Sequence, residues 1–297
     1  MMIVTRCDFR RTSEAVLFSE GYPAGDRSRA QRFTDRHLTE EEIMFEVAEA
    51  YERQRGRSSK ILAPLFVDFA GVRGEVLDVG CGTGALTFAI AQHKAVSKIV
   101  GLDMSEAFLA YARSKSDDPR IHFEQGDAQK LPFADGSFNC GLALLVMSFI
   151  TDAAKAATEM RRVTRPGGVV ATAMWDTTGG NQLNDALTEA ATVIDPEAKL
   201  LSGTHGTKEE LLALWTSAGL TNMEVNGIVF PCGFDSFDGY WQPLTEGQGP
   251  AGVYLRRVAE DQRTALREQL RQNIFGDRID GPFTLQAKAW AVKGIVP

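Results

Sequence analysis

Short apolar runs alternate with amphipathic stretches through the middle of this chain. Apolar runs predict strands at 76–79, 98–102, 120–125, 138–149 and 169–175. Helical spacing of apolar residues predicts helices at 85–94, 105–114 and 152–163. The run Leu-Ala-Leu-Leu-Val at 142–146 is apolar throughout, as expected for a parallel strand buried on both faces. This alternation favours an α/β fold with a largely parallel sheet.

The pattern extends on both sides of this central region. Thr39 and Glu42 form a potential capping box before a helix that includes Tyr51, and a second helix runs from Ser58 or Ser59 to Gly71. Pro64 lies inside that second helix and would kink it beyond its first turn. After residue 176 the pattern predicts helices at 181–194, 207–218 and 249–271, and strands at 222–231 and 283–295.

The N-terminal stretch has weak periodicity, and its arginines alternate with acids. We therefore expect a poorly ordered extension over residues 1–37 rather than a basic arm. The remainder, 38–297, is expected to be one domain. Its cofactor-binding core would cover 72–176, and a substrate-side lid and insertion would cover 177–285.

The composition of the chain argues against several classes of function. The chain has 297 residues and a formal net charge of −7, without the basic excess typical of nucleic-acid-binding proteins. Its four cysteines, at 7, 81, 140 and 232, have no CxxC spacing, which argues against a zinc or iron–sulfur site. The sequence shows neither an apolar run of membrane-spanning length nor a secretory h-region, so we expect a cytoplasmic protein.

A glycine-rich stretch follows the first predicted strand of the core. Val-Leu-Asp-Val at 76–79 leads into Gly80, Gly82 and Gly84, and a helix follows. A strand, glycine turn and helix in this order are typical of nucleotide-binding βαβ units. Gly80, Gly82 and Ala85 also fit the looser dinucleotide pattern G-x-G-x-x-A. Asp78 favours a different ligand, because a carboxylate at the end of a buried strand needs a cation or loop N–H groups as partners.

A second acid follows at the spacing expected for a ribose ligand. Asp103 ends the second predicted strand, 19 residues after Gly84, where adenosine-binding units place the carboxylate that holds the ribose hydroxyls. The alternative is that Asp103 caps the next helix, although Ser105 can take that role.

Four segments in order resemble the class I S-adenosylmethionine-dependent methyltransferases, within the methyltransferase type 11 or ubiquinone–menaquinone-biosynthesis-like group. They are residues 76–84, 100–105, 123–128 with 131–133, and 163–168. The resemblance covers about residues 75–175. It implies a Rossmann-like, doubly wound, seven-stranded sheet that is mostly parallel with an antiparallel last strand. It also implies a helical N-terminal preface and a helical insertion before the last strand. Asn139 departs from the family, which usually has an acid there.

The resemblance implies S-adenosyl-L-methionine as cofactor and assigns residues to it. These are Asp78, Gly80, Cys81, Gly82, Thr83 and Gly84 in the loop, Asp103 and Met104 at the ribose and adenine, Gly126, Asp127 and Ala128 at the adenine edge, Leu144, and Tyr51 with Arg57 near the methionine end. Alternatives stay open: Asp127 could form only an Asx turn, Tyr51 could be a core residue and Arg57 a solvated charge.

The acceptor is expected to be a small, largely apolar or aromatic molecule. Met147, Phe149, Trp175 and Trp241, with Tyr240, are candidates for its pocket wall, and core filling is the alternative for Met147, Phe149 and Trp241. We assign no catalytic residue and expect no metal; His205 is the one histidine considered as a base, against a solvated-loop position. We expect no nucleic-acid partner. The competing functions are a non-catalytic S-adenosylmethionine-binding regulatory protein and a nicotinamide-dependent oxidoreductase.

Overall fold

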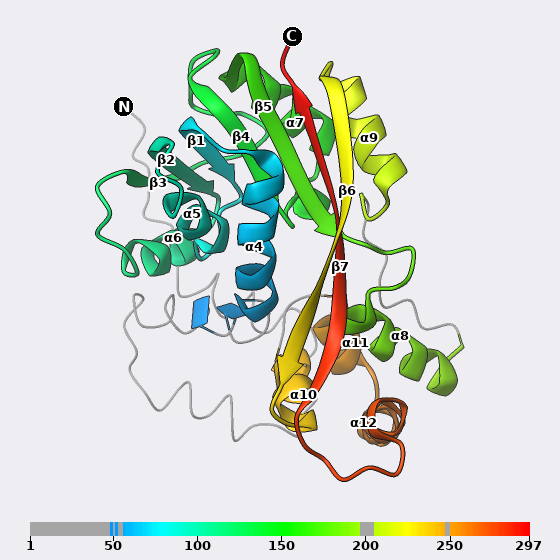
Figure 1. Ribbon diagram of the computed structural model, residues 1–297. Helices are drawn as coiled ribbons and strands as arrows, with labels where there is room; N and C mark the ends of the chain where they lie inside the picture. Colours follow the sequence, from blue (N-terminus) through cyan, green and yellow to red (C-terminus); the bar gives the residue numbers. More distant parts are fainter. Residues whose placement is uncertain (1–47, 50, 53–55, 197–204, 247–249) are drawn as a thin grey trace, which may run out of the picture. The chain divides into compact units, whose positions relative to one another are not determined.

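A computed structural model describes residues 48–49, 51–52, 56–196, 205–246 and 250–297 (Figure 1). The predicted extension over 1–37 and the capping box at Thr39 lie outside the described residues, as does most of the first helix. The chain divides into two units, Met1–Ile43 and Met44–Pro297, and all described residues belong to the second.

Seven strands of the described chain form one sheet in the order β3-β2-β1-β4-β5-β7-β6. Their bounds are β1 Gly74–Val79, β2 Val96–Asp103, β3 Ile121–Gln125, β4 Phe138–Leu144, β5 Thr164–Trp175, β6 Thr221–Phe234 and β7 Phe283–Ile295. Neighbours from β3 to β5 pair in parallel, and β7 is antiparallel to β5 and to β6. The doubly wound sheet with an antiparallel last strand is therefore confirmed. Its order reverses between β1 and β4, the place where such sheets bind ligands.

Helices cover both faces of the sheet (Figure 1). Their bounds are α4 Arg57–Ala70, α5 Ala85–Ala91, α6 Glu106–Arg113, η2 Met147–Phe149, α7 Ala153–Val163, α8 Gln182–Ile194, α9 Lys208–Ser217, α10 Phe237–Glu246, α11 Pro250–Arg257 and α12 Glu260–Phe275. The apolar sides of α4 and α5 form one core with the sheet, which includes Phe66 and Ile90. The apolar sides of α7 and α9 form a second core with the other face, which includes Met160 and Trp215.

Local sequence signals explain several boundaries. Gly71 ends α4 in the left-handed conformation, at φ +69°. Thr207 and Glu210 form a capping box that begins α9. Pro64 lies well inside α4 on its exposed side, where water can reach the carbonyl that lacks a Pro64 N–H partner. β4 ends at Leu144 and not near 149, because Leu145 adopts φ +59° and the chain turns into the short η2 helix.

The last two strands continue beyond the sheet as a two-stranded ribbon. β5 pairs only with residues 289–295 of β7, whereas β6 pairs with β7 as far as Phe234 opposite Phe283. Helices α8, α10, α11 and α12 surround this extension (Figure 1) and form a third core with it, which includes Leu187, Trp241 and Leu270. The expected insertion before the last strand is thus a helical cluster built on the ribbon.

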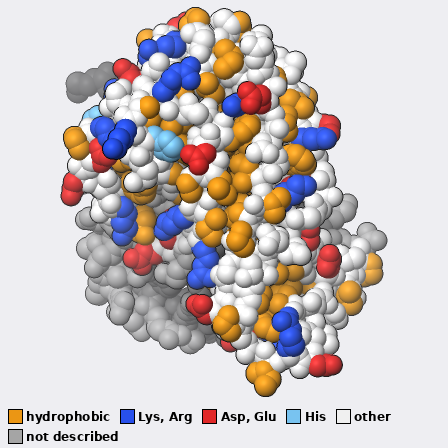
Figure 2. Space-filling view, viewed as in Figure 1, with side chains coloured by type: hydrophobic (Ala, Val, Ile, Leu, Met, Phe, Trp, Pro, Cys, Tyr) orange, Lys and Arg blue, Asp and Glu red, His pale blue; other side chains and the backbone are white. Residues whose placement is uncertain are grey.

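One face of this unit carries an apolar band. Hydrophobic side chains gather over α4 and the β6–β7 strands (Figure 2). Leu65 of α4 and Val229 of β6, which are 41% and 55% exposed, are apolar residues of these elements that remain accessible.

Candidate functional site

The glycine loop joins β1 to α5 with three glycines in the left-handed region. Gly80, Gly82 and Gly84 have φ values of +69°, +53° and +95°. A Cβ at Gly80 would lie 2.3 Å from Cγ2 of Val146, and one at Gly84 would lie 2.6 Å from the Phe88 ring. A Cβ at Gly82 would meet no atom within 4 Å. Two glycines therefore serve the packing of the loop, while Gly82 leaves its backbone open to a ligand.

Asp103 connects the end of β2 to this loop. Its Oδ2 accepts a hydrogen bond of 2.9 Å from Gly82 N–H, and its Oδ1 accepts one of 2.8 Å from Ser105 N–H. The side chain of Ser105 caps α6, as predicted, by accepting from Phe108 N–H. Since a carboxylate has about four acceptor positions, these two bonds leave capacity on Asp103 for a diol. Met104, next along the chain, is 67% exposed.

Asp78 is buried at the end of β1, between Gly101 of β2 and Leu142 of β4. Its Oδ2 accepts a hydrogen bond of 2.6 Å from the Thr87 hydroxyl of α5. Its Oδ1 has no hydrogen-bond partner within the described chain. Burial raises the pKa of Asp78 to about 7, partly opposed by the Thr87 bond, and the negative charge of Asp103 raises it further. A cation at the loop would be stabilised by this carboxylate.

Two further loop residues are buried. Burial raises the pKa of the Cys81 thiol well above its ordinary value, so Cys81 acts as a small apolar residue. The Thr83 hydroxyl donates a hydrogen bond to the Glu52 carboxylate, which also pairs with Lys60. Sequence reasoning did not select Glu52, because the register of the preface against the loop is set by tertiary packing.

The segment after β3 approaches Asp103 from the other side. Gly126 N–H donates to the Asp103 carbonyl at 3.0 Å, and a Cβ there would lie 2.8 Å from Cδ1 of Leu102. Asp127 forms the alternative Asx turn: its Oδ1 accepts from Gln129 N–H at 2.8 Å, and the bonds from Gln129 lower its pKa. Ala128 is buried in the second core. Leu144, at the end of β4, packs against the first core.

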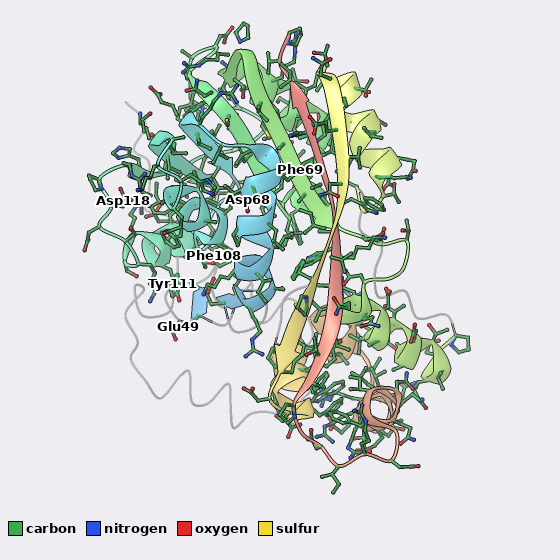
Figure 3. The ribbon with its side chains drawn as sticks, in the orientation of Figure 1. Glu49, Asp68, Phe69, Phe108, Tyr111 and Asp118 are labelled. Carbon is green, nitrogen blue, oxygen red and sulfur yellow. The ribbon has the colours of Figure 1, made fainter. Side chains whose placement is uncertain are left out.

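Tyr51 and Arg57, the two cofactor candidates that precede the glycine loop, contact different parts of the structure. Tyr51 is 36% exposed, and its ring centroid lies 5.0 Å from that of Phe108. Phe108 is on α6 and is labelled in Figure 3. Tyr51 thus lies against the helix that follows Asp103. Arg57 donates from Nη1 to the Gly233 carbonyl at 2.5 Å and contacts the β6–β7 ribbon instead.

Two residues expected in the wall of the acceptor pocket, Met147 and Trp241, lie in the hydrophobic core instead. Met147 is fully buried in the second core, because the turn at Leu145 directs it inward. Trp241 is 4% exposed and stacks on Phe237 in the third core. These two residues have the core-filling role that the sequence left open.

The other aromatic candidates have different surroundings. Tyr240 is also buried, and its hydroxyl donates to the Leu183 carbonyl at 2.8 Å. Trp175 is half-buried and packs 6.1 Å from the Phe230 ring. Phe149 is 74% exposed on η2. Phe149 is therefore the candidate that presents a free aromatic surface beside the carboxyl end of β4.

A buried polar group beyond β5 was not anticipated. The Asp176 carboxylate accepts from Thr178 N–H and pairs with Lys288 of β7 at 2.6 Å, and these contacts outweigh burial and lower its pKa. His205 lies beside this turn, since Gly206 accepts a hydrogen bond from Thr177 N–H. His205 is half-buried at φ +66°, so it is not fully solvated.

Within the described residues, no group of three or more His, Cys, Asp or Glu could hold a metal ion. The described helices are also too short or too polar to cross a membrane.

Comparisons with known proteins match the same region. The family model for the methyltransferase domain matches residues 77–172. The demethylmenaquinone methyltransferase of Chlorobaculum parvum is 40% identical over 94 residues, 32% of this chain and 38% of that protein. The malonyl-[acyl-carrier protein] O-methyltransferase of Pectobacterium atrosepticum is 36% identical over 120 residues, 40% of this chain and 45% of that protein. These matches thus span less than half the length of either relative.

The fold is also shared with solved structures. A candidate type II methyltransferase from Anaeromyxobacter dehalogenans aligns with a TM-score of 0.58 and 19% identity, over 80% of this chain and 96% of that one.

The buried Asp78 makes stability depend on pH. Because its pKa is raised in the folded protein, the folded state binds more protons than the unfolded state between about pH 4 and pH 7. The free energy of unfolding should therefore fall as pH rises through this window, by up to about 4 kcal/mol, and stay level above it. Asp78→Asn should flatten this slope in urea denaturation at pH 5 and pH 8. Equal slopes in the wild type and the variant would contradict the assignment.

The ordered motifs, the sheet order and the family match lead to one conclusion: residues 77–172 of this chain are a methyltransferase domain of the class I, S-adenosylmethionine-dependent type.

Proposed function

We propose that this protein transfers a methyl group from S-adenosylmethionine to a small-molecule acceptor. The observation that carries the proposal is the glycine loop. The backbone of Gly82 is open to a ligand and bonded to the Asp103 carboxylate, and the Asp78 carboxylate before the loop has one oxygen without a hydrogen-bond partner in the described chain. This combination suits a ligand that has both a ribose diol and positive charge.

Each part of the cofactor has candidate partners among the described residues. Asp103 would accept hydrogen bonds from the ribose hydroxyls, and the exposed Met104 would cover the adenine face. Asp127, with the backbone of Ala128, would bind the adenine edge. Gly80 to Gly84 would surround the methionine portion, with the charge of Asp78 behind them. Tyr51 would approach the same portion from the preface, whereas the contact of Arg57 with the ribbon directs it elsewhere.

The protein's part in the reaction is positioning. When bound, S-adenosylmethionine would supply a methyl group activated by its sulfonium, which could be transferred in line to a nucleophile with the thioether sulfur of S-adenosylhomocysteine as the leaving group. The protein must hold the acceptor behind that methyl group and exclude water. Phe149 on η2 follows the carboxyl end of β4, next to the strand that leads into the loop, and would contact the acceptor.

The relatives support a small acceptor. The names of the Chlorobaculum parvum and Pectobacterium atrosepticum proteins specify demethylmenaquinone and a malonyl group on acyl-carrier protein. The acidic composition of this chain also disfavours a polyanionic nucleic acid as acceptor.

Calorimetry tests the cofactor directly. We expect S-adenosylmethionine and S-adenosylhomocysteine to bind with micromolar dissociation constants and to raise the melting temperature of the purified chain, because the loop is already formed. NAD should produce neither effect. A response to NAD together with no heat from either methionine derivative would contradict the proposal and favour the oxidoreductase alternative.

Gly82→Ala tests the loop as the binding surface. The left-handed backbone should cost the variant roughly 1–2 kcal/mol of stability without a clash, since no atom lies within 4 Å of the new Cβ. Cofactor affinity should fall at least tenfold, because the alanine Cβ occupies space that the ligand needs at the backbone of residue 82.

Gly71→Ala is the matched control. Gly71 also has positive φ, at +69°, and open space around its Cβ, but it lies at the end of α4. The Gly71→Ala variant should lose a similar amount of stability and keep the cofactor affinity of the wild type. Equal affinities in both variants would show that ligand does not approach Gly82.

A further inference from the structure

Arg57 presents an oriented guanidinium group that has no carboxylate partner among the described residues. Its Nη1 donates to the Gly233 carbonyl at 2.5 Å, and its Cζ lies 5.5 Å from the centroid of the Phe234 ring. The side chain is exposed. Within the described chain no Asp or Glu pairs with it, in contrast to Arg113 and Arg120, which each pair with an acid. Arg57 is thus fixed in place while most of its N–H donors remain available.

The contact with Gly233 places this group beyond the carboxyl end of the sheet. Phe230 of β6 packs against Trp175, the last residue of β5. Gly233 follows Phe230 by three residues, so at about 3.3 Å per residue it lies about 10 Å farther along the ribbon. Open α/β sheets bind their ligands outside the carboxyl ends of the strands. Arg57 therefore lies on the side of the sheet where an acceptor is expected.

The guanidinium of Arg57 contacts the ribbon and not the cofactor loop, although the backbone of Arg57 follows Gly56, which lies beside Glu52. In the sheet, β4, β5 and β7 lie between β1, which leads into the loop, and β6, whose Gly233 carbonyl binds Arg57. The preface reaches the loop through Glu52 instead, which accepts from Thr83. Arg57 thus belongs to the ribbon side, while Glu52 belongs to the cofactor side.

The charged or ionisable groups near Arg57 that the structure describes form no ion pair with its guanidinium. Glu52 is engaged by Lys60 and Thr83. Cys232 lies in the same part of β6, but burial raises the pKa of its thiol to about 11, so it stays neutral. Asp235 is exposed and forms no ion pair with Arg57. The local charge that Arg57 offers to a ligand is therefore positive, in a chain whose net charge is −7.

We propose that Arg57 binds an anionic group, a carboxylate or a phosphate, on the methyl acceptor. This inference rests on the methyltransferase function proposed above and defines the class of its substrate. A guanidinium has five N–H donors in a planar fork that matches two oxygens of such a group. The Gly233 carbonyl and the Phe234 ring hold that plane, so little side-chain freedom is lost when the anion binds.

The test uses simple anions on protein saturated with S-adenosylhomocysteine. Benzoate and inorganic phosphate are titrated, with uncharged benzamide as the comparison, and the arginine Nε–H resonances are followed by NMR. We expect benzoate and phosphate, but not benzamide, to shift the Arg57 resonance. Arg57→Gln should bind both anions at least fivefold more weakly, and Arg57→Lys should recover part of the affinity, because it retains the charge without the fork.

Arg278→Gln is the control for losing a stacked surface arginine. Arg278 also donates to backbone carbonyls, those of Phe275 and Ile274, and lies 5.6 Å from the Phe275 ring, but it follows α12 in the helical cluster. It should leave anion binding unchanged.

Three results would overturn the inference. They are equal binding of benzamide and benzoate, unchanged anion affinity in Arg57→Gln, and a loss of S-adenosylhomocysteine affinity in Arg57→Gln. The last would show that Arg57 holds the carboxylate of the cofactor. If the wild type binds no S-adenosylhomocysteine, the methyltransferase proposal fails instead. The anion titration is therefore repeated without cofactor, so that Arg57 is tested in either case.

Discussion

The carboxylate of Asp78 is enclosed where the strand order of the sheet reverses, between β2 and β4. Thr87 bonds one of its oxygens and so attaches α5 to the end of β1, while the other oxygen has no hydrogen-bond partner in the described chain. A buried charge with incomplete compensation is costly. The site is therefore stabilised when a cation binds at the loop or when Asp78 takes up a proton.

The rest of the loop is held by contacts from separate parts of the chain. Asp103 fixes the backbone of Gly82 from β2, and Val146 packs against Gly80 after β4. Glu52 bonds Thr83 from the preface. Because these contacts come from different elements, the loop conformation is set by the whole core. The ribbon, with Arg57 across it, forms a separate boundary on the acceptor side.

Much of this arrangement could be predicted from the sequence, because its signals are local. The predicted last strand, 283–295, coincides with β7, and Ser105 caps α6 as its sequence position indicates. The positions of Gly82 and Asp103 follow from strand ends and fixed spacings. Both strands run in parallel, so their carboxyl ends meet at one edge of the sheet.

The acceptor side could not be predicted in the same way, because distant pairings determine it. The positive φ of Leu145, which turns Met147 into the core, has no glycine to signal it. Trp241 belongs to a core that exists only because β6 and β7 extend past β5. Arg57 contacts a carbonyl 176 residues away, and no local pattern indicates that partner.

Proton exchange on ligand binding tests the role of Asp78 most directly. Calorimetric titration of S-adenosylmethionine at pH 6.5, in buffers of different ionisation enthalpy, measures the number of protons released. A cation beside Asp78 should lower its pKa from about 7, so binding to the wild type should release a substantial fraction of one proton. Asp78→Asn should release none from this site. Binding without proton release, or equal release in both proteins, would contradict the account.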